Sequence, residues 1–207
     1  MPYSRAEKKE YQLEQIVKLI EQGSGVARTR DIEALGVDYR RVETFVKEGS
    51  LRRLKNGYYT TPGGEYTEEQ LFTTLFPEGV LTMETALYYH GYLKQRPYGW
   101  YVAISKNTSK SRFSLEYPIV TPYYTEEAVL SLGVENITIC GKEMKIYDID
   151  RLICDVLKYE EKMDRQDFRE AALCYIRDEK KNVLNLMEYA RERKVLHKVQ
   201  TMIGVWL

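Results

Sequence analysis

A chain of 207 residues with 43% hydrophobic and 30% charged residues has an ordinary globular composition, which excludes a wholly disordered protein. No run of about 18 apolar residues occurs and the first ten residues hold no apolar stretch, so we expect neither a membrane span nor a secretory signal. Basic and acidic residues are equal in number, at 31 each, and the three cysteines lie far apart, as expected of reduced thiols in a cytoplasmic protein.

The first part of the chain predicts three helices. Apolar residues at helical spacing indicate a helix over residues 7–22, with charged residues on its other face. Thr29 is the expected N-cap of a short second helix that Gly36 ends. Asp38 is the expected N-cap of a third helix over residues 39–48.

A hairpin and a domain boundary follow. Strand-like runs at residues 51–54 and 58–61 are joined through Lys55-Asn56-Gly57, and Asn-Gly at this place is the strongest short-range hairpin signal. Pro62-Gly63-Gly64 is the best candidate boundary, and it divides the chain into domains at residues 1–62 and 63–207. Twelve basic and nine acidic residues give the first domain a net charge of +3 and leave −3 for the second, which favours an anionic partner for the first.

Three helices followed by a two-stranded hairpin have the order of a winged helix-turn-helix, with Gly36-Val37-Asp38 as the short turn. The third helix of this motif can enter the major groove of DNA, while basic residues on the wing contact phosphate. The alternative is a solvated helix face that simply carries charge, because Glu43 and Glu48 lie among the basic residues. The candidate DNA contacts are Thr29, Arg30, Tyr39, Arg40, Arg41, Thr44, Lys47, Arg52, Arg53 and Lys55.

The second domain is predicted to be mixed α+β and to end in a helical tail. Thr67 and Gln70 form a capping box for a helix that ends at Phe76. Strands are expected over 100–104 and 117–121, with a hairpin over 137–147, and further helices over 82–89, 148–160, 164–176, 182–193 and 195–204. The residues of the tail expected to face the core are Leu184, Met187, Val195, Val199 and Met202.

Catalytic motifs are scarce. The sequence has no phosphate-binding loop, nucleophile elbow, H-E-x-x-H or paired C-x-x-C motif, so neither a cofactor nor a metal is expected. His90 is expected to be a packed or hydrogen-bonded ring. Asp148, Asp150 and Asp155 lie around one predicted helix start, where carboxylates stabilise the helix dipole, and we interpret Asp150 with Arg151 as a surface or structural pair.

Three stretches carry a resemblance to a known family. Residues 31–37, continuing to a G-x-Y wing strand and Pro62, form the first. Residues 81–91 are similar to an S/T-x-E-T-A-L-x-x-H-G element, and residues 146–155 to a v-y-D-x-E-R-t-l-c-D element in which Asp150 replaces the commoner Glu. In this order the stretches resemble the AbiEi family, the antitoxin half of type IV toxin–antitoxin pairs of abortive infection, which is a phage defence.

The resemblance implies a non-enzymatic protein whose winged helix represses its own operon by binding operator DNA. The second domain would counter a co-encoded nucleotidyltransferase-like toxin, and a stable complex with that toxin is not implied. The alternative is a metal-dependent nucleic-acid-processing enzyme that the winged helix targets to DNA, with Glu84, Asp148 or Asp155 as metal ligands. Thr82, Glu84 and Thr85 are otherwise expected to cap a helix.

Overall fold

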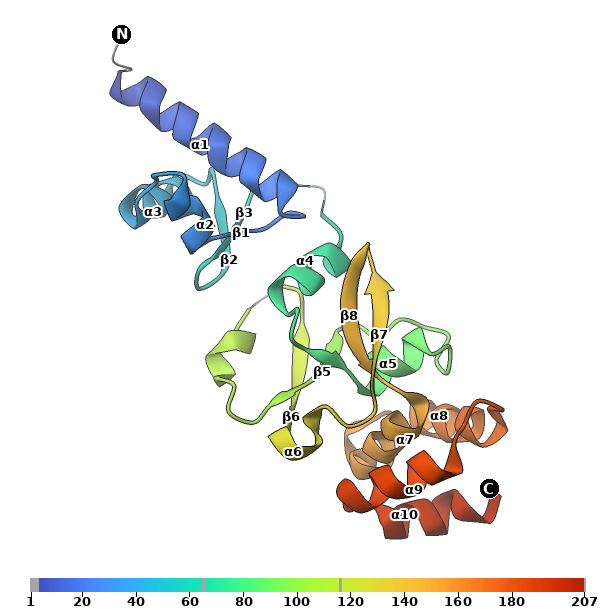
Figure 1. The fold of residues 1–207 in the computed structure, drawn as a ribbon. Helices are drawn as coiled ribbons and strands as arrows, with labels where there is room; N and C mark the ends of the chain where they lie inside the picture. The colour runs from blue at the N-terminus through green and yellow to red at the C-terminus, as the bar shows by residue number, and fades with distance from the viewer. Residues whose placement is uncertain (1–3, 65, 116, 207) are drawn as a thin grey trace. The chain divides into compact units, whose positions relative to one another are not determined.

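The computed structural model describes residues 4–64, 66–115 and 117–206. The chain divides into two compact units (Figure 1). The described residues up to Pro77, with those between 114 and 118, form the first unit, and the remaining residues form the second. The predicted fold class, α+β with an N-terminal winged helix-turn-helix and a C-terminal mixed α+β part, is confirmed. The first unit continues past the predicted boundary at residues 62 and 63.

The first unit has the element order of a winged helix followed by one more helix. Its elements are α1 (Arg5–Gln22), β1 (Ala27–Arg28), α2 (Thr29–Ala34), α3 (Tyr39–Lys47), β2 (Arg52–Lys55), β3 (Tyr58–Thr60) and α4 (Glu68–Leu75). Strand β3 lies between β1 and β2 in an antiparallel sheet. The sequence did not predict β1, because a strand of two residues is too short to show a periodicity.

Two of the predicted caps in this unit are present and one is wrong. Asp38 Oδ1 accepts from the Arg41 amide at 2.8 Å, and Thr67 forms the predicted capping box with Gln70. Thr29 is the first residue of α2, not its N-cap. Strand β1 leads directly into α2, so the extended residue at the N-cap position is Arg28, and the Thr29 amide donates to the carbonyl of Gly57 in the wing turn at 2.9 Å.

The core of the first unit lies between the helices and the sheet. Its buried members are Ile16, Ile20, Ala27, Ile32, Val37, Val42, Phe45, Leu51 and Tyr59. The segment after the predicted boundary packs against this core, because Tyr66 lies over Gly25 so closely that a Cβ there would come within 2.4 Å of the ring. Gly25 also has a φ of +92°, a conformation that other residues rarely adopt. Pro62-Gly63-Gly64 is therefore a turn within the unit.

The second unit is built on a five-stranded mixed sheet. Its strands are β4 (Val80–Leu81), β5 (Trp100–Ser105), β6 (Val120–Thr125), β7 (Val134–Ile139) and β8 (Lys142–Tyr147), in the order β6-β5-β4-β8-β7. The predicted hairpin is confirmed as β7–β8, with Ile137 opposite Met144. Strand β6 begins later than predicted, and as an edge strand paired only with β5 it tolerates Pro122, which has no amide to donate.

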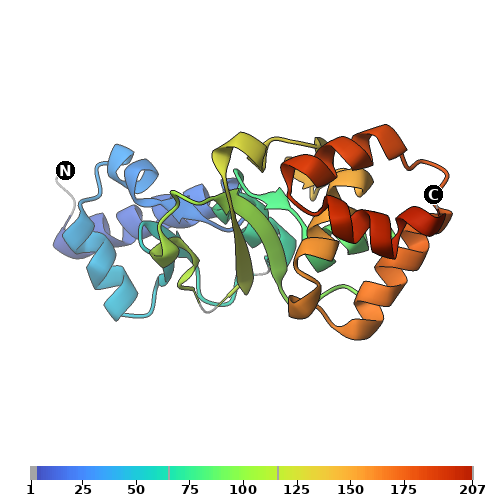
Figure 2. The same cartoon turned by 90° about the horizontal axis from the view of Figure 1, so that it is seen from below.

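Helices gather at the C-terminal end of the second unit, where the orange to red helices lie together in Figure 2. The helices of this unit are α5 (Met83–Tyr89), α6 (Glu127–Leu130), α7 (Ile149–Lys158), α8 (Arg165–Arg177), α9 (Val183–Glu192) and α10 (Leu196–Met202), with 3-10 turns η1 (Lys110–Phe113), η2 (Glu160–Lys162) and η3 (Gly204–Trp206).

The predicted core face of the tail is partly wrong. Val195 and Val199 are buried as predicted, but Leu184 is 82% exposed and Met202 is 41% exposed. Leu186 and Ala190 supply the buried face of α9 instead. Apolar residues occur on more than one side of the helix predicted over 182–193, so the sequence alone does not determine which side packs on α7.

Helix α7 is buried from Asp150 to Leu157 and contacts the tail through polar side chains. Its N-cap Asp148 accepts from the Arg151 amide, as predicted, and from the Tyr189 hydroxyl of α9 at 3.2 Å. Asp150 accepts from the Tyr175 hydroxyl of α8 at 2.8 Å and from the Asn182 amide at 2.9 Å. Burial raises the pKa of the carboxyls of both Asp148 and Asp150.

Asp150 and Arg151, predicted as a surface or structural pair, do not lie at the surface and have structural partners other than each other. Both residues are buried, and Arg151 pairs with Asp155, one turn later, at 2.6 Å. Arg193, which follows α9, reaches the same carboxylate oxygen at 2.6 Å. One buried carboxylate thus stands between two buried guanidinium groups, and the Tyr147 ring lies against Arg151 at 4.3 Å. The role of these residues is to join α7 to α9, beyond any effect on the helix dipole.

Asp155→Ala is expected to lower the free energy of unfolding of the second unit by about 3–5 kcal/mol, because it leaves two buried arginines without their counter-charge. Both tryptophans of the chain, Trp100 and Trp206, lie in this unit, so tryptophan fluorescence in a urea titration reports its unfolding. Glu179→Ala, at an exposed position before α9, is the matched control and should change the midpoint little. Equal stability of the two variants would contradict the role given to Asp155.

Glu84 is a second buried carboxyl of this unit. It is 6% exposed, and its Oε2 has no hydrogen-bond partner among the described residues. Burial, with a smaller contribution from Asp167, raises the pKa of Glu84 from 4.5 to about 7. The helix caps predicted for its neighbours are not formed, since Thr82 makes no cap bond and the Thr85 hydroxyl accepts from the Tyr101 amide of β5 at 2.8 Å.

The stability of the second unit is expected to fall as the pH rises from about 4.5 to 7. The folded state keeps the Glu84 proton in this range while the unfolded chain releases it, and the loss is about 3 kcal/mol at most. Glu84→Gln should remove this loss, so that the variant is the more stable protein at pH 8 and equal to the parent near pH 4.5. Glu188→Gln, exposed on α9, is the control. The measurement is the urea midpoint of all three proteins at several pH values in this range. If the midpoints of the parent and of Glu84→Gln change with pH in parallel, the role given to Glu84 is wrong.

Candidate nucleic-acid interface

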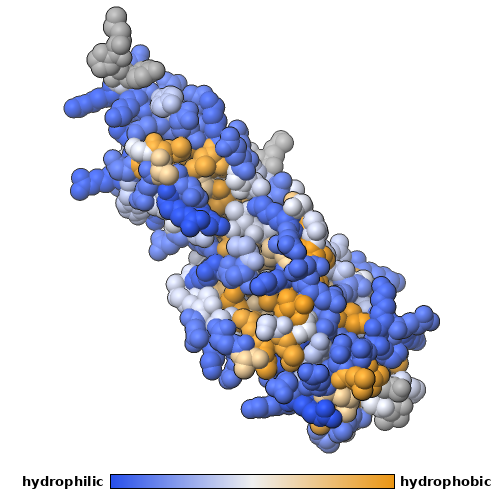
Figure 3. All heavy atoms as spheres, viewed as in Figure 1, coloured by the Kyte–Doolittle hydropathy of each residue, from blue (hydrophilic) through white to orange (hydrophobic). Residues whose placement is uncertain are grey.

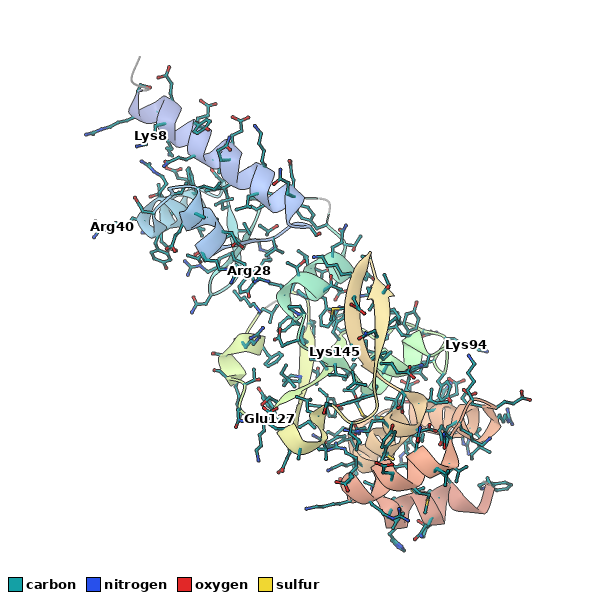
Figure 4. All side chains as sticks on the ribbon, viewed as in Figure 1. Lys8, Arg28, Arg40, Lys94, Glu127 and Lys145 are labelled. Atoms are coloured by element: carbon teal, nitrogen blue, oxygen red, sulfur yellow. The ribbon has the colours of Figure 1, made fainter. Side chains whose placement is uncertain are left out.

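The exposed side of α3 carries three of the predicted DNA-contacting residues in one stripe. Arg40, Thr44 and Lys47 are spaced by four and three residues, which places them on the same side of a helix. Arg40 and Lys47 are exposed, and neither forms an ion pair among the described residues; Arg40 projects away from α1 in Figure 4. The Thr44 hydroxyl donates to the Arg40 carbonyl at 2.9 Å, which still leaves its oxygen able to accept.

Tyr39 and Arg53 lie side by side between α3 and the wing. Arg53 donates to the Tyr39 hydroxyl at 3.3 Å and forms an ion pair with Glu43, one turn after Tyr39 on α3. Its guanidinium also lies over the Tyr59 ring at 5.7 Å, and the hydrogen bond to Tyr39 raises the pKa of Arg53. Arg53 is therefore half-buried and joins the wing to α3. The sequence predicted it only as a basic residue of the wing that contacts DNA.

The acidic residues that argued for a merely solvated face are both paired. Glu43 is bound by Arg53, and Glu48 is bound by Lys9 of α1 at 2.6 Å. An ionised carboxylate with a basic partner repels a phosphate less than a free one does. The charges of this side of the helix that remain without a partner among the described residues are basic.

The remaining candidates are spread around this stripe. Arg41 is half-buried on the next side of α3, and Arg52 is exposed at the start of β2. Thr29 is half-buried beside the wing turn, and Arg30 is exposed with its guanidinium 3.3 Å from Asp31. The structure thus brings the wing turn and the start of α2 together, a proximity that sequence spacing alone does not reveal.

Lys55 is not exposed at the tip of the wing, so this part of the prediction is wrong. Its side chain is buried, its Nζ donates to the Leu75 carbonyl at the end of α4 at 3.0 Å, and the Phe76 ring lies 4.2 Å from the ammonium. The register shifts between Arg53 and Lys55, so that Leu54 and Lys55 together stand opposite Tyr58. A bulge of this kind re-aims a side chain, and it is not visible in the alternation of the sequence.

Arg28 is a basic residue of this unit that sequence reasoning missed. It ends β1 directly before α2 and is labelled in Figure 4. Its guanidinium lies 5.8 Å from the centre of the Tyr58 ring. An arginine stacked on an aromatic ring keeps its charge available at a fixed position. The signal that could have found it is the pair Tyr58-Tyr59 in the wing strand, opposite which a cation can stack.

The acidic residues of the alternative enzyme serve as structural groups. Asp155 is bound by two arginines, Asp148 caps α7, and Glu84 is a buried carboxyl whose pKa is raised to about 7 by burial. Across residues 4–64, 66–115 and 117–206, no group of three potential ligands has the spacing of a metal site. His90 is a hydrogen-bonded ring as expected, with its Nε2 2.7 Å from the Tyr147 carbonyl.

Comparisons with known proteins address the first unit. Residues 14–62 match the family model described as "Transcriptional regulator, AbiEi antitoxin", and this segment runs from the middle of α1 to the end of the wing. No curated protein matches the chain. In the described part of the chain no helix is both long and apolar enough to cross a membrane. The winged helix of this protein is therefore a domain of the AbiEi antitoxin and transcriptional-regulator family.

Proposed function

We propose that this protein is the DNA-binding autorepressor and antitoxin of a type IV toxin–antitoxin system. The winged helix binds operator DNA upstream of its own operon, and the second unit counters a co-encoded nucleotidyltransferase-like toxin. The observation that carries the proposal is the stripe of Arg40, Thr44 and Lys47 on α3, whose neighbouring acids are already paired within the unit. It is a non-enzymatic role, in keeping with the family of the winged helix.

The proposed DNA contacts divide by their geometry. Arg40, in the first turn of α3, and Thr44, one turn later, are the candidates for contacts to base edges, since a guanidinium fork suits guanine and a threonine methyl suits thymine. Lys47, Arg52, Arg41 and Arg30 are candidates for phosphate contacts around the helix. Arg53 supports Tyr39 from the wing, and Arg28 replaces the buried Lys55 as a basic group near the wing turn.

Arg40→Ala is expected to weaken binding to the upstream region of its own gene by about 1–3 kcal/mol and to change the ranking of sites within it. Lys47→Ala should weaken binding to all sequences and lower the slope of log affinity against log salt by about 1. Fluorescence anisotropy with labelled duplexes across a salt series measures both effects.

The matched control is Lys18→Ala, which removes one exposed lysine from α1, where it pairs with Glu14. This variant should bind DNA like the parent protein, because its side chain belongs to none of the proposed contacts. If it weakens binding as much as Arg40→Ala does, the effect comes from net charge alone and the assignment to α3 is wrong.

The antitoxin role of the second unit is supported by its resemblance to the two AbiEi elements at residues 81–91 and 146–155. The first of these stretches contains α5, and the second leads into α7, most of whose residues are buried. Because most residues of α5 and α7 are buried in the core of the second unit, we expect the groups that act on the toxin or its target to lie on the surface of this unit.

A full-length variant with Arg40→Ala and Lys47→Ala is expected to lose repression of its own promoter while it still relieves growth arrest by the co-encoded nucleotidyltransferase. The substitutions lie in the first unit only, so they remove DNA contacts without touching the second unit. A promoter reporter and a growth assay in the same cells measure both activities. Loss of rescue at an equal level of folded protein would show that the two activities cannot be separated.

A further inference from the structure

An apolar groove lies on the helical side of the second unit, and none of the residues assigned above to DNA lines it. It has a volume of about 970 Å³ and is formed by α7, α8, α10 and the turns η2 and η3. Its apolar lining includes Phe168, Ala172 and Ile176 of α8 and, from the C-terminal segment, Met202, Ile203 and Trp206. Figure 3 shows apolar side chains at the surface beside the C-terminal end of the chain.

Helix α8 presents two parallel rows of side chains to this groove. Phe168, Ala172 and Ile176 follow one another at intervals of four residues and form an apolar row. Arg165, Arg169, Leu173 and Arg177 follow the same spacing and form the row beside it. One edge of an apolar groove is therefore lined with arginines.

The charges around the groove are unequal. None of the three arginines forms an ion pair among the described residues, whereas Glu160, one of the two lining acids, is bound by Lys198 at 2.7 Å. Glu161 is the other lining acid, on the turn η2. A partner that fits the groove thus needs an apolar face and acidic groups along the flank that meets α8.

The shape of the groove favours a helix of another protein. Its rim residues Leu173, Met202 and Trp206 are 43%, 41% and 69% exposed, so the lining is open to solvent, whereas a small-molecule pocket encloses most of its ligand. Much of its wall is formed by side chains of α8, and the amides and carbonyls within a helix are already paired and leave no edge for an added strand.

We propose that this groove binds an amphipathic helix of a partner protein, with an apolar face in the groove and acidic residues against Arg165, Arg169 and Arg177. The flexible side chains of Met163 and Met202 adapt the lining to the leucine-like residues of such a helix. The inference rests on the lining of the groove alone, so it holds whether or not the chain is an antitoxin.

The test uses the full-length protein and two synthetic, fluorescein-labelled amphipathic peptides of about 15 residues. Both have leucines at helical positions i, i+3, i+4 and i+7, and one carries glutamates and the other lysines on the flank. The acidic peptide is expected to bind with a micromolar Kd in fluorescence polarisation, and the basic peptide at least about tenfold more weakly.

Two groove variants and two controls locate the binding. Leu173→Asp and Arg169→Ala should each weaken binding of the acidic peptide, the first by about tenfold or more. Leu184→Asp and Arg191→Ala make the same changes at exposed positions of α9 outside the groove and should leave it unchanged. Leu173 is 43% exposed, so Leu173→Asp is expected to fold. Its urea midpoint, compared with that of the parent protein, checks this.

Three results would overturn the proposal. One is equal binding of the two peptides, or binding that Leu173→Asp leaves intact. Another is a dimer of the parent protein that Leu173→Asp converts to a monomer in light scattering, since the groove would then hold a second copy. The third is displacement of the acidic peptide by a single-stranded RNA whose own binding depends on Arg169, which would assign the surface to nucleic acid.

Discussion

A single buried carboxylate, that of Asp155, stabilises the arrangement of the second unit. It stands between Arg151 of its own helix and Arg193 after α9, and all three side chains are almost without solvent contact. Two guanidinium groups and one carboxylate leave an excess positive charge inside the unit, which the Tyr147 ring against Arg151 partly offsets. Because α9 leads directly into α10, the same ion pairs fix the C-terminal segment that forms one wall of the apolar groove.

The first unit uses ion pairs for a different purpose. Two acidic residues near the exposed stripe of α3 have basic partners on other elements: Glu43 pairs with Arg53 of the wing, and Glu48 pairs with Lys9 of α1. Ion pairs at a protein surface contribute little to stability, so the main effect of these two pairs is on the electrostatic potential around α3. The first unit has a modest net charge, yet the exposed side of α3 carries basic residues, Arg40 and Lys47, that have no ion-pair partner among the described residues.

Local signals in the sequence predicted much of the fold. The caps at Asp38 and Asp148 depend on neighbouring backbone amides, and the wing turn depends on the positive φ of Gly57, so a few adjacent residues determine each of them. The errors concern side chains whose direction depends on distant partners. A bulge and the carbonyl of Leu75 determine where Lys55 lies, and Asp150 is buried because α8 and α9 supply its donors. The stripe of α3 was readable as a helix face, whereas the pairing of its acids was not.

The burial of Lys55 limits how the wing can change in length. Its ammonium lies between the rings of Tyr58 and Phe76 and donates to a carbonyl at the end of α4. One residue inserted between Lys55 and Tyr58 would alter this register, and the Leu75 carbonyl would lose its charged donor. Related chains that lengthen the turn would therefore need a compensating change at the end of α4, so the helix that follows the wing limits the size of the wing.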